Sequence, residues 1–79
     1  MNREPVKSSF IKEIGWENGT LEIKFSNDQV WQYFGVPPET WAGFRVAQSQ
    51  GKFFHNYIKP NYAAQDVTSI EKLPSVGPA

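Results

Sequence analysis

The chain of 79 residues contains no cysteine, only one histidine and no long apolar run. Without cysteine, disulfide bonds and thiolate metal sites are excluded, and the composition suits a reducing compartment. One histidine falls short of a typical ligand set, so we expect neither a metal nor a cofactor. No apolar stretch approaches the ~20 residues that span a bilayer, and the N-terminus lacks the apolar core of a secretion signal. A cytoplasmic protein without membrane contact is therefore expected.

The chain also lacks net charge, because eight basic side chains balance eight acidic ones. A neutral chain is a poor non-specific binder of duplex nucleic acid, since such binding depends on neutralising phosphates. The balance is uneven along the sequence. Residues 29–62 carry Arg45, Lys52 and Lys59 against a single acid, Glu39, so this segment is mildly basic.

Aromatic residues are abundant, with three Trp, three Tyr and six Phe. Each aromatic side chain can bury about 150–250 Å², so we expect rings to supply most of the core. A chain this short buries a modest fraction of its surface. Its stability should therefore be marginal unless a second copy or a partner covers more apolar area, and a homo-oligomer is expected.

Three strands are predicted in the first half of the chain, at residues 7–16, 20–25 and 29–36. The first two flank Asn18-Gly19, a pair that tolerates the positive φ angles of a tight hairpin turn. In the third strand, alternation puts Trp31 and Tyr33 on one face. The opposite face then carries Val30, Phe34 and Val36.

Two helices follow the strands. Pro37 and Pro38 end the third strand and favour a helix that continues to Ala47. A second helix is predicted over residues 50–58, closed by Pro60, and residues 63–79 are predicted to be a mobile tail. We therefore expect an α+β domain over residues 6–62: a three-stranded antiparallel meander followed by two short helices packed on one face.

The junction between the two helices is a candidate anion site. Ser49 is placed to cap the second helix, because its side-chain oxygen can accept from backbone N–H groups two or three residues on. Free N–H groups at a helix start favour an anion. The side chains of Arg45, Lys52, His55 and Lys59 and the backbone at Gly51 could complete a phosphate site near this junction. The alternative is a tight helix–helix corner filled by phenylalanines.

The aromatic pair Trp31 and Tyr33 is a second candidate site. On an open sheet face these rings could stack on bases, each stack contributing about 1–3 kcal/mol. Alternatively, the same face packs against the helices or against a second copy. A catalytic role is not expected, because the single histidine, His55, and Ser49 are six residues apart, on different faces of a continuous helix.

Five segments together resemble the KTSC domain family, which is named for its occurrence at the C-terminus of some lysyl-tRNA synthetases. They are Val6-x-Ser8-Ser9, Ile14-Gly15-Trp16, Leu21-Glu22-Ile23-x-Phe25, Trp31-x-Tyr33-Phe34-x-Val36-Pro37 and Ala47-x-Ser49-x-Gly51-Lys52-x-Phe54-x-x-Ile58. The resemblance spans Val6 to Tyr62. Two positions depart from the family pattern, since Trp31 and Trp16 stand where tyrosines are usual. The family also occurs as stand-alone bacterial and phage proteins, and the resemblance implies RNA binding without an established activity.

Two functions remain open. The first is a non-enzymatic binding module for a nucleotide-containing ligand, either single-stranded RNA or DNA or a small nucleotide sequestered by a stand-alone protein. Aromatic rings would hold the base, and the junction at Ser49 would hold phosphate. The second is a protein-interaction module whose exposed rings and strand edges dock a partner or a second copy, with no nucleotide ligand.

Overall fold

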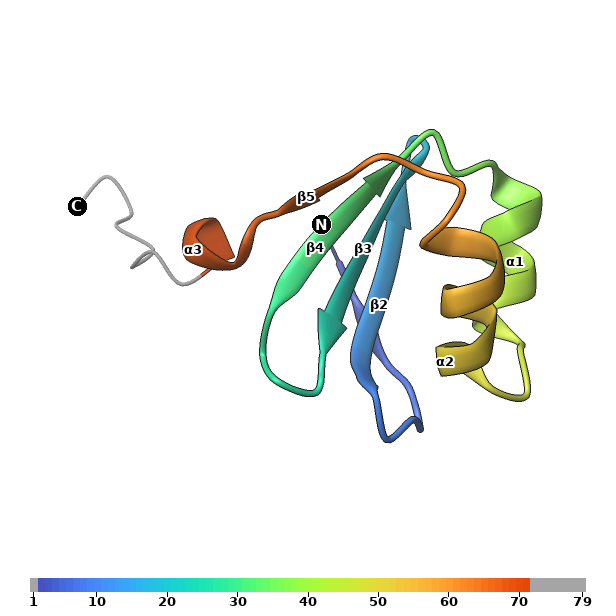
Figure 1. Ribbon diagram of the computed structural model, residues 1–79, viewed down its shortest axis with the longest axis horizontal. Coiled ribbons are helices and arrows are strands. Elements are labelled where there is room, and N and C mark those ends of the chain that lie inside the picture. Colours follow the sequence, from blue (N-terminus) through green and yellow to red (C-terminus); the bar gives the residue numbers. More distant parts are fainter. Residues whose placement is uncertain (1, 72–79) are drawn as a thin grey trace.

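In the computed structural model, which describes residues 2–71, the chain forms one antiparallel sheet with helices after the first four strands. Its elements are β1 (Glu4–Pro5), β2 (Ile11–Glu17), β3 (Thr20–Phe25), β4 (Val30–Phe34), α1 (Pro38–Arg45), α2 (Gln50–Phe53), the π-helical turn η1 (Phe54–Ile58), β5 (Ala64–Asp66) and α3 (Thr68–Glu71). The strand order in the sheet is β1-β2-β3-β4-β5. The α1 and α2 helices lie on the same side of the sheet (Figure 1). The α+β class is confirmed, but the sheet has five strands rather than three.

The hairpin between β2 and β3 follows from local chemistry. Asn18 and Gly19 have φ angles of 50° and 86°, and Glu17 pairs with Thr20 across the turn. Positive φ at both central residues gives the turn whose twist matches that of the strands. The predicted hairpin is confirmed.

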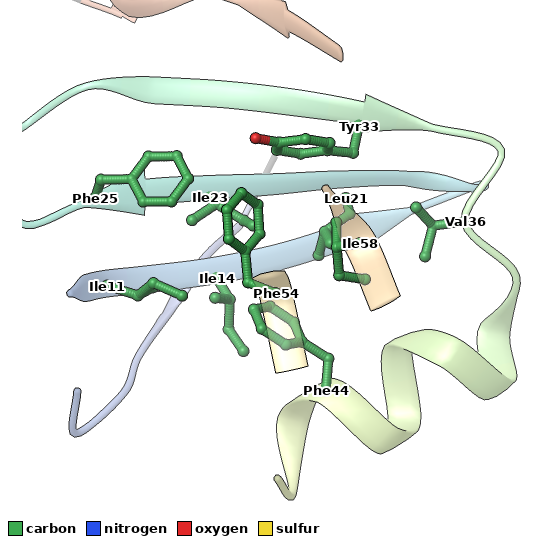
Figure 2. Close-up of a cluster of buried hydrophobic side chains, with 10 residues drawn as sticks. All are labelled: Ile11, Ile14, Leu21, Ile23, Phe25, Tyr33, Val36, Phe44, Phe54 and Ile58. Atoms are coloured by element: carbon green, nitrogen blue, oxygen red, sulfur yellow. The ribbon is translucent and has the colours of Figure 1, made fainter. Parts of the chain in front are cut away.

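The face of the sheet that meets the helices carries the core. Leu21 pairs with Tyr33 and Ile23 pairs with Trp31 across the β3–β4 ladder, so alternation puts all four side chains on this face. Side chains from α1 and η1 cover it (Figure 2). The buried cluster comprises Ile11, Ile14, Leu21, Ile23, Phe25, Tyr33, Val36, Phe44, Phe54 and Ile58. The face shared by Trp31 and Tyr33 is thus the covered one.

The end of β4 departs from the predicted alternation. Val36 was expected opposite Trp31, yet it is fully buried in the same core cluster as Tyr33. Gly35 has a φ angle of 77°, a conformation that glycine adopts without steric cost. This residue ends the strand and turns the chain, so that Val36 points into the core.

The two predicted helices are present, with shifted ends. The first ends at Arg45 rather than Ala47, and the second runs from Gln50 through the π-helical turn to Ile58. The Ser49 side chain accepts a hydrogen bond from the Lys52 backbone N–H at 3.2 Å. The predicted capping role of Ser49 is therefore confirmed.

The prediction of a mobile tail is wrong for residues 64–71, which form β5 and α3. Residues 72–79 lie outside the described part of the chain. Here β5 pairs with β4, and α3 contacts β4 as well. The Val30 N–H donates to Thr68 Oγ1 at 2.9 Å, and the Val67 N–H donates to the Val30 carbonyl at 2.8 Å. These elements, like β1, are too short to carry a periodic pattern. They form because hydrogen bonds to the rest of the fold hold them.

Candidate ligand groove

A groove of about 480 Å³ opens where the sheet meets η1, beside the turn between β3 and β4. Its wall is aromatic and comes from four separate segments of the chain. The rings are those of Phe10, Phe25, Trp31, Tyr33 and Phe54. The volume falls in the range of about 300–1,000 Å³ that is typical of small-molecule sites.

Contacts between rings hold the wall of this aromatic groove. The Phe54 ring centre lies 5.3 Å from that of Phe25 and 5.4 Å from that of Tyr33, both nearly edge-on. The Phe10 ring lies 5.3 Å from Phe25. Edge-to-face and tilted pairs are the favourable geometries for aromatic rings. Because Phe25, Tyr33 and Phe54 are buried whereas Phe10 is 38% exposed, Phe10 forms the part of the wall nearest solvent.

Trp31 and Tyr33 both reach the groove because they are two positions apart on β4 and therefore share one face of the sheet. Trp31 is half-buried, and its indole Nε1–H donates to Gln29 Oε1 at 3.2 Å. The Gln29 N–H in turn donates to Asn27 Oδ1 at 3.0 Å. The bond to Gln29 Oε1 holds the Trp31 indole, whereas the bond to Asn27 comes from the Gln29 backbone and fixes the turn before β4.

Tyr33 contributes a polar end to an apolar wall. Its side chain is buried, and its hydroxyl oxygen points toward Phe25, in the direction of the groove (Figure 2). Burial raises the pKa of Tyr33 to about 12. The phenol therefore stays protonated at neutral pH and can donate a hydrogen bond.

The remaining lining of the groove is mostly polar and nearly uncharged. Ser26, Asn27 and Gln29 come from the turn before β4, and Lys59 follows η1. Among the lining residues in the described part of the chain, Lys59 alone carries a charge. A single cation beside aromatic rings suits a flat ligand that bears an anionic group.

Of the eight ligand residues that the sequence predicts, the groove brings together Trp31, Tyr33 and Lys59. His55 borders the groove without lining it, because its ring stacks on Phe10 with 5.7 Å between centroids and an interplanar angle of 18°. The imidazole thus supports the outermost ring of the groove.

The other four predicted residues lie at the α1–α2 junction and do not line the groove. Ser49 caps α2, whose residues include Gly51 and Lys52. A Cβ on Gly51 would lie 3.8 Å from Phe10, so this junction borders the outer side of the aromatic wall. The α2 helix has only four residues, which limits the dipole that its amides can offer to an anion.

Arg45 is held by an acidic side chain. Its Nε donates to Glu4 Oε1 at 2.7 Å and its Nη2 donates to Oε2 at 3.2 Å. These hydrogen bonds, and the attraction between the two charges, raise the pKa of Arg45. The guanidinium also lies 5.4 Å from the centre of the Trp41 ring. A phosphate at this position would have to displace the Glu4 carboxylate.

Sequence patterns did not single out Phe10, Phe25 or Phe54 as site residues. Phe25 is the last residue of the strand predicted at residues 20–25, and this place next to a turn is a usable signal. Phe10 and Phe54 carry no such signal, because only the fold brings these distant segments together. Within residues 2–71 the structure contains neither a membrane-spanning helix nor a metal-ligand cluster of three or more His, Asp or Glu.

The fold and its groove define a small α+β domain in which one face of an antiparallel sheet and a helical segment enclose an aromatic site. The sequence profile of the KTSC domain matches residues 7–62. The chain belongs to the KTSC domain family, as its motifs indicated.

Proteins similar to this chain differ widely in length. A protein of Tsukamurella paurometabola is 32% identical over 63 residues, which cover 77% of this chain and 94% of that protein. The crystal structure of a KTSC domain protein from Yersinia pestis is 39% identical, with a TM-score of 0.80, and covers 82% of this chain and 94% of that one. The lysine–tRNA ligase of Trichormus variabilis is 33% identical over 64 residues, which are 78% of this chain and 11% of the ligase.

Proposed function

We propose that this protein is a non-enzymatic binding module for a nucleotide-containing ligand, whose base lies in the aromatic groove. The observation that carries the proposal is the groove itself, about 480 Å³ in volume, lined by five rings and one lysine. Stacking on aromatic side chains contributes about 1–3 kcal/mol per base. A site of this size accepts one base with its sugar rather than a run of bases.

Lys59 is the cation best suited to the phosphate. It lines the groove, its side chain is exposed, and within residues 2–71 it takes part in no ion pair. Its ammonium can therefore reach a phosphate, and such charge-assisted hydrogen bonds are strong. Arg45, in contrast, already holds the Glu4 carboxylate with two hydrogen bonds. We therefore favour Lys59 over the α1–α2 junction as the phosphate contact.

Calorimetric titration with the four ribonucleoside 5′-monophosphates tests the proposal, using wild type, Lys59→Ala and Lys52→Ala. We expect wild type to bind at least one nucleotide. Lys59→Ala should weaken that binding about tenfold, the magnitude of one charge-assisted hydrogen bond. Lys52→Ala is the matched control, because it removes an exposed lysine that does not line the groove, and its affinity should stay within about twofold of wild type.

Two results would contradict the proposal in different ways. If wild type binds no nucleotide at about 1 mM, a concentration that half-occupies even a site with a Kd of about 1 mM, the proposed function is wrong. A loss in Lys52→Ala that Lys59→Ala does not share would move the phosphate to the junction capped by Ser49 and leave the groove without a role in charge recognition.

A protein-interaction module is the second candidate function. It is favoured by β5, an outer strand of the described sheet whose three side chains are all exposed. An outer strand offers unpaired backbone groups on which a second copy or a partner strand can pair. Light scattering coupled to gel filtration tests association through this edge. A dimer that Ala64→Pro dissociates would support it, because the Ala64 N–H faces away from β4, and a concentration-independent monomer would contradict it.

A further inference from the structure

The Tyr33 side chain combines deep burial with a polar atom aimed at the groove. Only 5% of the residue is exposed, and the Phe54 ring meets its ring nearly perpendicularly, at an interplanar angle of 80°. The ring is therefore fixed, and its hydroxyl oxygen points toward Phe25, which also lines the groove (Figure 2).

Within residues 2–71, no hydrogen bond joins this hydroxyl to another protein group, whereas the Tyr62 hydroxyl lies 3.4 Å from Thr40 Oγ1. Every fully buried side-chain nitrogen or oxygen in the described part of the chain has a partner, so the Tyr33 hydroxyl must reach the groove. The O–H is therefore open to the groove and available to donate a hydrogen bond to a group that enters it.

We propose that Tyr33 is the specificity-determining residue of the groove, and that its O–H donates to a ring nitrogen or carbonyl oxygen on the edge of the bound base. This assignment rests on the proposed function. Stacking on Phe10 and Trp31 does not distinguish bases, because every base has a π-face. The fixed hydroxyl does distinguish them, since the bases differ in where their acceptors lie. Because the pKa of Tyr33 lies far above neutrality, the proton is available for donation.

Tyr33→Phe tests the assignment, because it removes one oxygen and keeps the ring. The variant should fold and melt at the wild-type temperature or above it, since the lost hydroxyl has no partner within the described chain. Calorimetric titration with the four ribonucleoside monophosphates should show a preferred base for wild type. Tyr33→Phe should weaken the preferred base about tenfold, leave the others within about twofold, and so remove most of the discrimination. Tyr62→Phe, which deletes a hydroxyl away from the groove, should bind as wild type does.

The possible outcomes separate the two claims. If wild type binds and Tyr33→Phe keeps the same preference, the assignment of Tyr33 is wrong while the binding function stands. A uniform loss for all bases would also overturn it, since that result indicates a change in packing. If wild type binds none of the four nucleotides, the proposed function fails, and the assignment fails with it.

Discussion

At the scale of single residues, Tyr33 joins the core to the groove. Its ring packs edge-on against Phe54 and its hydroxyl end is directed at the groove. The same burial that fixes the ring raises the pKa of its phenol to about 12. One side chain thus contributes to stability and to the proposed recognition, and the two contributions respond differently to pH and to substitution.

Tyr33 should make stability fall at high pH. Its pKa in the fold lies above the value of about 10 for an unfolded tyrosine. The contribution is therefore complete below pH 10 and is lost as the pH rises through 12, because the unfolded chain releases the proton first. Urea unfolding at pH 10 and pH 12 should show wild type losing on the order of 2 kcal/mol more than Tyr33→Phe. Identical losses in the two proteins would contradict the assigned burial.

Two glycines should respond in opposite ways to alanine. A Cβ on Gly15 would lie 2.4 Å from the Asn2 carbonyl oxygen, so the backbone must move, whereas a Cβ on Gly51 meets only Phe10 at an ordinary 3.8 Å. Gly15→Ala should destabilise the fold by about 1–3 kcal/mol. Gly51→Ala should be neutral or stabilising by up to about 1 kcal/mol, since Gly51 is helical. Urea midpoints measure both, and a costly Gly51→Ala would show that the α2 backbone is not an ordinary helix.

At the scale of elements, local chemistry predicts some parts of the fold and not others. The hairpin at Asn18-Gly19 and the helix cap at Ser49 depend on residues within a few positions, so their prediction from sequence succeeds. The strands β1 and β5 depend on partners that are distant in sequence. A strand of two or three residues has no periodicity to detect. These short strands therefore become visible only in the assembled sheet.

Thr68 should be the residue that fastens the C-terminal elements to the sheet. Its Oγ1 accepts from the N–H of Val30, which is fully buried. Thr68→Ala leaves that N–H without its partner and should destabilise the attachment by about 1–3 kcal/mol. Hydrogen exchange at the Val30 amide should accelerate accordingly. Ser69→Ala, at an exposed neighbouring position of α3, is the control and should leave the exchange rate unchanged. An unchanged rate in both variants would show that Thr68 does not hold the segment.

At the scale of the whole molecule, the groove exists because the fold brings four segments together. Sequence patterns identified Trp31 and Tyr33 as a pair on one face, and both line the groove together with Lys59. The same patterns grouped Lys59 with Arg45 at the helix junction instead, because a sequence shows which residues are charged but not where their side chains lie in the fold. The ion pair between Arg45 and Glu4 joins residues far apart in the chain, so only the structure reveals it.

The charge distribution of the molecule predicts weak salt dependence. The chain has no net charge, and Lys59 is the only charged residue among those that line the groove in the described structure. Binding of a nucleoside monophosphate should therefore weaken by less than about tenfold between 50 mM and 500 mM salt, because few counterions are released. A steep decline, or far tighter binding of single-stranded oligonucleotides, would instead indicate a cationic track along a strand.

The central claim is that a nucleotide base enters the aromatic groove, and the indole N–H signals of the three tryptophans test it most directly. Trp31 lines the groove, whereas the Trp16 indole donates to the Val36 carbonyl and Trp41 lies beside Arg45. In a nitrogen–proton correlation spectrum recorded during titration with nucleoside monophosphates, the Trp31 indole signal should shift saturably while the other two stay in place. A spectrum in which the Trp31 signal does not move at saturating nucleotide would contradict the claim.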